Sequence, residues 1–242
     1  MIKKYIILIL LKIFDYYHNK KILNFLKKKI ININIFLDIG AHKGESINLF
    51  INNFNINNIY SFEPSIDNYD RLKKNILNFN KKYKKTNFRI YNFGFGEKKT
   101  DLILNQSIET SSSTFNKINV ESKYYNKKIF YLKNKKEQFF KETLSKLDTL
   151  DNFFYENKIS LVDVIKIDTE GYEYFVLKGF TQNFHKVRFI IFEHHYDNMI
   201  IKKYTFLNIN DLLKKNNFFQ IYKSKMPFRK TFEYIYVNKN KL

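Results

Sequence analysis

Asp38, Gly40, Ala41 and Gly44 lie together in the segment FLDIGAHKGES, directly after an apolar run. Glycines at such a position let a ligand approach the backbone closely. The G-x-x-x-G spacing lacks the third glycine of the dinucleotide fingerprint, and no Gly-Lys-Ser/Thr follows it. The Asp38 carboxylate would repel a pyrophosphate and attract an ammonium. The segment therefore favours a ligand with an amino-acid head over NAD.

A second acid, Glu63, ends the next apolar run, in the segment IYSFEPS. An acidic residue at the end of the second strand can accept hydrogen bonds from both hydroxyls of a ribose. S-adenosylmethionine carries a ribose diol and an ammonium, so Asp38 and Glu63 together predict it as the cofactor. Two alternatives remain. The cofactor could be a nicotinamide dinucleotide, or Asp38 and Glu63 could be solvent-exposed acids that bind no cofactor.

The elements that must position these residues follow from hydrophobic periodicity. Apolar runs alternate with amphipathic segments that predict helices at 45–53, 64–79 and 171–177. Near-continuous apolar strands between helices predict a parallel sheet that is covered on both faces. We therefore expect an α/β fold with a doubly wound, mostly parallel sheet flanked by helices. The expected strands are 33–38, 59–63, 88–93, 162–168 and 189–193, with edge strands at 218–222 and 232–237.

Seven segments follow one another in an order that resembles FkbM-type S-adenosylmethionine-dependent methyltransferases. They are FLDIGAHKGES, IYSFEPS, NFGFGEK, the serines 111–113, TLDNF, VIKIDTEGYEYFVLKG and IIFEHH. The resemblance covers about residues 33–195, and its most specific part is KIDTEGYEYFVLKG at 166–179. Thr169 departs from the aliphatic or aromatic residue that the family often has there. The resemblance implies a class I (Rossmann-like) methyltransferase fold, S-adenosyl-L-methionine as donor and O-methylation of a hydroxyl.

The resemblance also implies roles for particular residues. Asp168 and Glu170 would lie beside the transferable methyl, and Asp168 would also contact the donor. The adenine edge would lie at the end of the third strand. The implied donor-binding residues are Asp38, Gly40, Ala41, Gly44, Glu63, Asn92, Phe93, Gly94 and Asp168.

A hydroxyl acceptor needs a group that takes its proton. Candidates at the expected strand ends are Asp168, Glu170, Glu193, His194 and His195. We favour His194 as the base, because histidine titrates nearest neutral pH, with Asp168 and Glu170 positioning the acceptor. Alternatively, the two acids cap the following helix and either histidine is structural. Asp168, Glu193 and His194 would also suit Mg²⁺ or Mn²⁺, but no spacing fixes such a site and we predict no metal.

The composition limits the partners. The formal net charge is +20, from 43 Lys and Arg against 23 Asp and Glu. Most basic residues are lysines in a chain rich in Ile and Asn, a mixture typical of an A/T-rich coding sequence. We therefore expect no specific nucleic-acid binding and a small-molecule or glycan acceptor. The absence of Cys excludes disulfides and a Cys nucleophile, and suits a cytoplasmic protein.

The chain divides into an N-terminal helical extension at 1–30 and a methyltransferase domain at 31–242. Residues 100–146 interrupt the alternation of predicted strands and helices, and we interpret them as a lid-like insertion. The apolar run 5–11 is shorter than the roughly 20 residues that span a membrane. We expect this helix to pack on the domain; weak peripheral membrane contact is the main alternative, and a signal peptide lacks a cleavage site.

Together these features predict an O-methyltransferase that acts on a hydroxyl of a sugar, a glycan or another small metabolite. A nucleic-acid methyltransferase is the second enzyme hypothesis. A catalytically inactive S-adenosylmethionine-binding module is the non-enzyme alternative. An inactive module is disfavoured because the expected donor-binding residues are all present: Asp38, Gly40, Glu63 and Asp168.

Overall fold

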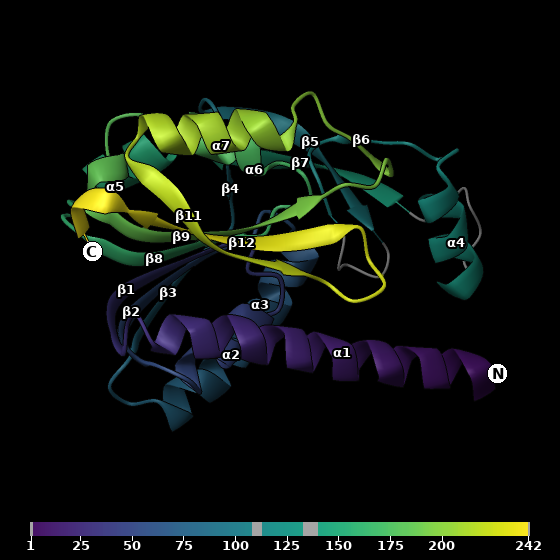
Figure 1. Ribbon diagram of the computed structural model, residues 1–242, viewed down its shortest axis with the longest axis horizontal. Helices are drawn as coiled ribbons and strands as arrows, with labels where there is room; N and C mark the ends of the chain where they lie inside the picture. Colours follow the sequence, from purple (N-terminus) through teal and green to yellow (C-terminus); the bar gives the residue numbers. More distant parts are fainter. Residues whose placement is uncertain (1, 108–112, 133–139, 242) are drawn as a thin grey trace.

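The computed structural model describes residues 2–107, 113–132 and 140–241. Its centre is a seven-stranded sheet with the order β11-β12-β9-β8-β1-β2-β3 (Figure 1). The five strands from β3 to β9 are parallel, and β12 runs antiparallel to both β9 and β11. This confirms the doubly wound, mostly parallel sheet. The strands are β1 (Asn32–Ile39), β2 (Asn55–Phe62), β3 (Asn87–Tyr91), β8 (Val162–Ile167), β9 (Val187–His195), β11 (Phe218–Lys225) and β12 (Thr231–Asn238).

Helices cover both faces of the sheet (Figure 1). One face carries α1 (Ile2–Lys27), α2 (Glu45–Ile51) and α3 (Ile66–Lys82), and the other carries α5 (Leu150–Glu156), α6 (Glu173–Lys178) and α7 (Phe206–Lys215). Short 3₁₀ turns lie at Phe184–Lys186 and Lys239–Lys241. The sequence patterns predicted α2, α3 and α6 but not α5 or α7.

Strand alternation divides the core into two layers. Phe36, Val164 and Phe189 pack with the helices of the α1 side. Their chain neighbours Leu37 and Ile165 pack with the helices of the α5 side. Because both faces are buried, the strands contain nearly continuous apolar residues, as the sequence showed. The same alternation decides which polar residues at the strand ends share a face.

Helix α1 occupies most of the expected extension and packs on the domain. Ile22, Leu23 and Leu26 are buried in the core layer of that side. The His18 imidazole lies 3.0 Å from a carboxylate oxygen of Glu233 on β12, and both side chains are buried. Among the described residues, no helix is long and apolar enough to cross a membrane.

The region expected as an insertion forms a small second sheet. Strands β5 (Thr100–Ser107) and β7 (Phe140–Asp148) are antiparallel, and β4 (Gly94–Phe95) pairs in parallel with the other edge of β7. Strand β6 (Lys117–Ile118) pairs with β10 (Ile200–Ile201), and α4 (Lys123–Leu132) follows β6. Of the serine run, residues 111 and 112 lie outside the described residues. This second sheet covers one side of the site described next.

Candidate active site

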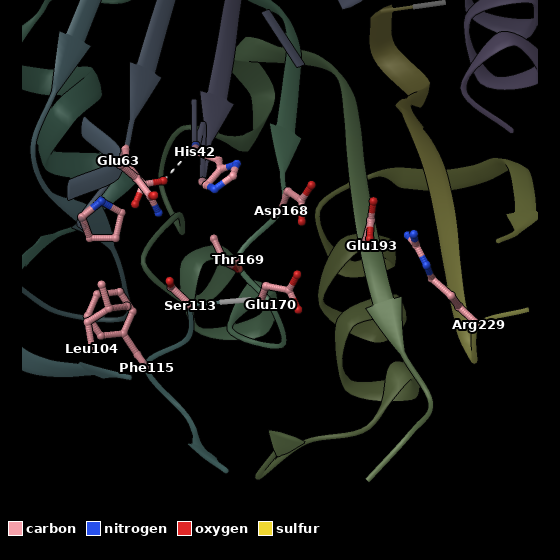
Figure 2. Close-up of a pocket in the computed structure, with 13 residues that line it drawn as sticks. His42, Glu63, Leu104, Ser113, Phe115, Asp168, Thr169, Glu170, Glu193 and Arg229 are labelled. Carbon is pink, nitrogen blue, oxygen red and sulfur yellow. Dashed lines mark hydrogen bonds between the residues drawn. The ribbon is translucent and has the colours of Figure 1, made fainter. Parts of the chain in front are cut away.

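A cavity opens at the carboxyl ends of β1, β2, β8 and β9 (Figure 2). This is where ligands bind to open α/β sheets. It brings together five residues that the sequence singled out: Gly40, Glu63, Asp168, Glu170 and Glu193. The complete lining is Gly40, His42, Glu63, Pro64, Asn68, Leu104, Ser113, Phe115, Asp168, Thr169, Glu170, Glu193 and Arg229.

The loop between β1 and α2 forms one wall, and Gly40 fixes its position. Its backbone adopts φ +84°, and an added Cβ would lie 1.9 Å from the Asp168 carbonyl oxygen. The Gly40 N–H donates to the Phe62 carbonyl at 2.9 Å. Only glycine permits both the positive φ and this close approach. The loop is thereby held against the ends of β2 and β8.

Glu63 fastens the same loop through its side chain. The His42 N–H donates to Glu63 Oε2 at 2.8 Å, and the Ser65 N–H donates to Oε1 at 2.9 Å. Burial raises the pKa of Glu63, while these backbone donors act in the opposite direction. The carboxylate therefore orders the loop and also lines the cavity.

Asp38 is fully buried and is not part of the cavity lining. Neither carboxylate oxygen has a hydrogen-bond partner among the described residues. Burial raises the pKa of Asp38 to about 7, although the Lys166 ammonium opposes that shift. A buried, unpartnered carboxylate is costly. An ammonium from a ligand would satisfy it, and Asp38 lies only two residues before the cavity-lining Gly40.

Asp168 is held by a buried lysine two residues earlier. Lys166 Nζ lies 2.7 Å from Asp168 Oδ2. Burial alone would raise the pKa of Asp168, but the Lys166 ammonium lowers it below its ordinary value. Burial alone would lower the pKa of Lys166, but the carboxylates of Asp168 and Glu193 raise it. The pair is therefore ionised, with Asp168 fixed at the cavity.

Asp168, Glu170 and Glu193 form what we call the acidic wall of the cavity (Figure 2). Burial and the nearby Asp168 carboxylate raise the pKa of Glu193 well above its ordinary value. His195 lies behind this wall, with Nε2 3.5 Å from Glu170 Oε2. Burial would lower the pKa of His195, but Glu170 and Asp197 raise it to about 9. His195 is therefore a cation at neutral pH rather than a free base.

His194 lies on the other face of β9, which corrects its expected grouping with Asp168 and Glu170. Side chains alternate along a strand, so Glu193 and His195 share one face and His194 occupies the opposite one. The His194 ring packs against Tyr196, Tyr204 and Phe206, with centroid distances of 4.7, 5.9 and 5.7 Å. Burial lowers its pKa to about 3. His194 does not line the cavity.

The residues expected at the adenine edge also lie outside the lining. The Asn92 side-chain amide donates to the Glu63 carbonyl at 2.9 Å and so supports the end of β2. Phe93 packs on Phe62, and Gly94 belongs to β4. Ala41 is buried in the core, and Gly44 is the N-cap of α2. As donor contacts, these residues remain predictions.

Several lining residues were not singled out by the sequence. His42 lies within FLDIGAHKGES, so the motif itself marked its position. Leu104 and Phe115 come from the inserted region, and Arg229 comes from the turn between β11 and β12. No local pattern connects these three to the motif. Within the described part of the chain, no group of three or more His, Asp or Glu residues is arranged to hold a metal ion.

Comparison with known families gives one match. The methyltransferase FkbM domain matches residues 38–219, which is most of the chain and includes every residue that lines the cavity except Arg229. No curated protein sequence matches the chain at a significant level.

Solved structures share the fold at low sequence identity. An FkbM methyltransferase from Methylobacillus flagellatus superposes with a TM-score of 0.54 at 15% identity, covering 86% of this chain and 44% of that one. The present chain thus spans less than half of that protein. Magnesium protoporphyrin IX methyltransferase from Synechocystis, with bound SAM, gives 0.51 at 8% identity, covering 94% and 81%. An rRNA methylase from Streptococcus thermophilus gives 0.50 at 8% identity, covering 89% and 93%.

Proposed function

We propose that this chain, which belongs to the FkbM methyltransferase family, is an S-adenosylmethionine-dependent methyltransferase that methylates a hydroxyl of a sugar, a glycan or another small metabolite. The observation that carries this proposal is the acidic wall. Three carboxylates, two from the segment that follows β8 and one from β9, line the cavity that Gly40 and Glu63 also line. A wall of carboxylates provides acceptors for the hydrogen bonds of a hydroxylated substrate.

The residues present fit S-adenosylmethionine. Asp38 is a buried carboxylate without a partner among the described residues, as an ammonium-binding group would be. Glu63 lines the cavity at the end of the second strand, where it would accept the ribose hydroxyls. Gly40 leaves the loop backbone accessible beside them. When bound, the donor supplies an electrophilic methyl group on a positively charged sulfur.

An acceptor hydroxyl is a weak nucleophile until its proton is removed. We assign the proton acceptor to Glu193, because it lines the cavity and its pKa is raised by burial and by the Asp168 carboxylate, whereas the pKa of Asp168 is lowered, so Glu193 is the stronger base of the two. Asp168, held ionised by Lys166, would orient the hydroxyl by accepting a hydrogen bond. Alignment of the oxygen with the methyl supplies much of the rate enhancement in such reactions. This assignment replaces His194 as the base.

The test is methyl transfer from isotopically labelled S-adenosylmethionine to separate panels of glycans, small hydroxylated metabolites and RNA, with products identified by mass spectrometry. The proposal predicts label on a hydroxyl oxygen of a glycan or metabolite. Label on RNA alone, or on a nitrogen atom, would contradict it. A Glu63→Ala variant is the control, since its loss of signal ties the product to this cavity.

A further inference from the structure

The outward face of α1 carries large apolar side chains that the domain does not cover. Leu10, Ile13 and Tyr17 follow the i, i+3, i+7 spacing of a single helix face. They are 45%, 44% and 57% exposed, and the adjacent Tyr16 is 61% exposed. The opposite face of the helix carries the buried His18 and the core residues described above. Figure 1 shows that the N-terminal part of α1 projects past the end of the sheet.

Lysines continue this face toward the end of the helix. Lys20, Lys21, Lys27 and Lys28 are all exposed. The tip of the β11–β12 hairpin lies alongside and extends the surface. Its Phe228 is 79% exposed, and its ring packs on Phe14 with a centroid distance of 5.0 Å. We call the exposed residues Leu10, Ile13, Tyr16, Tyr17, Lys20, Lys21 and Phe228 the α1 surface.

The chemistry of the α1 surface distinguishes among occupants. Tyr side chains suit the boundary between hydrocarbon and water, because one end is apolar and the other is polar. Lysines beside them attract anionic headgroups and can extend their charge into the headgroup layer. A second copy of the chain would bring a net charge of +20 against another +20. Charge complementarity therefore favours an anionic lipid over self-association.

We propose that the α1 surface docks on an anionic lipid bilayer. The helix lies in the interface and does not cross it, because its inner face is occupied by the contacts of Ile22, Leu23 and Leu26 with the core of the domain. This inference is independent of the methyl-transfer proposal, because it rests on the outer surface alone.

Docking would also place one edge of the cavity near the headgroups. Arg229 lines the cavity, and its Nη2 lies 2.8 Å from Asp15 Oδ2 on α1. Arg229 follows Phe228 directly at the hairpin tip. The Arg229 side of the cavity is therefore joined to the docking helix by an ion pair, and an acceptor at the membrane surface would approach from this side.

The experiment is sedimentation of the full chain with vesicles of phosphatidylcholine and phosphatidylglycerol in equal parts, and with vesicles of phosphatidylcholine alone. We expect binding to the anionic vesicles and little to the neutral ones. Tyr17→Asn and the double variant Lys20→Glu/Lys21→Glu should each weaken binding about fivefold or more. The matched controls are Tyr155→Asn, whose side chain is 82% exposed on α5, and Lys84→Glu/Lys85→Glu, which removes the same charge from an exposed turn. Both controls should bind like the parent.

Three results would overturn the inference. The first is no sedimentation with anionic vesicles. The second is an equal loss in the surface variants and their controls, which would show binding through diffuse charge alone. The third is a dimer, measured by light scattering, that Tyr17→Asn dissociates while vesicle binding is absent, because a second copy would then be the occupant.

Discussion

Asp38 combines complete burial with the lack of a hydrogen-bond partner among the described residues. Its pKa is raised from 3.8 to about 7, chiefly by burial. A group whose pKa is higher in the folded than in the unfolded state stabilises the fold at low pH and loses that contribution as pH rises. The parent should therefore lose stability between the two pKa values.

Asp38→Asn tests this reasoning. The variant cannot ionise, so its free energy of unfolding relative to the parent should increase from about pH 4 to about pH 7 and then remain constant. Urea unfolding across this range provides the measurement, with Asp211→Asn at an exposed position as control. A pH-independent difference between Asp38→Asn and the parent would mean that Asp38 ionises normally. Weaker binding of S-adenosylhomocysteine by Asp38→Asn would support its role at the donor ammonium.

Lys166 is the buried cation that lies next to the acidic wall. Replacing it in Lys166→Met leaves the half-buried Asp168 without its 2.7 Å partner and should destabilise the protein by about 1.5–3 kcal/mol, as when a hydrogen bond to a charged group is lost. The pKa of Asp168 should rise, so the fall in kcat/KM at acid pH should move to higher pH. The control is Lys178→Met, which breaks a 2.8 Å pair with Glu97 at the surface. Such exposed pairs contribute about 1 kcal/mol or less. Equal effects of the two substitutions would contradict the assignment.

At the scale of elements, the loop between β1 and α2 depends on Glu63. Glu63→Ala removes the acceptor of the His42 and Ser65 N–H groups and the expected ribose contact. Loss of a hydrogen bond to a charged group costs about 1.5–3 kcal/mol, so the affinity for S-adenosylhomocysteine should fall about tenfold or more. Calorimetric titration measures this, with thermal unfolding as a check that the variant is folded.

Asp151 provides a matched control for that substitution. Its carboxylate accepts backbone N–H groups of Thr181, Gln182 and Asn183, in a turn that does not line the cavity. Asp151→Ala should therefore lower stability while donor affinity stays unchanged. If Glu63→Ala binds the donor like the parent, or if both variants lose affinity equally, the ribose assignment is wrong.

Strand β9 shows how far the sequence predicts the site. The apolar residues of the segment IIFEHH correctly predicted a strand at 189–193, and the observed strand β9 ends two residues later, at His195. The run did not reveal its register, because continuous burial on both faces removes the alternation that would mark one. A shift of one residue exchanges His194 for Glu193 or His195 at the cavity. The choice of base therefore depended on tertiary structure.

The cavity residues that lie in sequence motifs could be predicted, whereas those from distant segments of the chain could not. Gly40, Glu63 and Asp168 were predictable because the carboxyl ends of adjacent parallel strands must meet. Arg229 was not, because its position depends on the antiparallel pairing of β11 with β12 and on Asp15 of α1. Leu104 reaches the cavity on β5 of the small second sheet, and Phe115 directly follows Thr114, which pairs with Asn105 of the same strand. Pairing between segments that are distant in the sequence cannot be predicted from the local periodicity of apolar residues.

At the scale of the whole molecule, the net charge of +20 contrasts with the acidic wall of the cavity. The lysines lie outside the cavity, so any affinity for RNA should be electrostatic and independent of sequence. Filter binding at increasing salt should show a steep loss. Sequence-selective RNA binding that persists at about 200 mM salt would instead support a nucleic-acid methyltransferase.

The central claim is that a carboxylate of the acidic wall, and not His194, takes the acceptor proton during hydroxyl methylation. Single-turnover methyl transfer by Glu193→Gln and His194→Gln, with the acceptor found in the labelling panel, tests it most directly. Glu193→Gln should lose about 10²–10⁴-fold in rate, with S-adenosylhomocysteine affinity unchanged, because the lost interaction belongs to the transition state. His194→Gln should stay within a few fold of the parent, since its ring lies in the aromatic layer on the opposite face. A near-parental rate for Glu193→Gln together with a crippled His194→Gln would contradict the account.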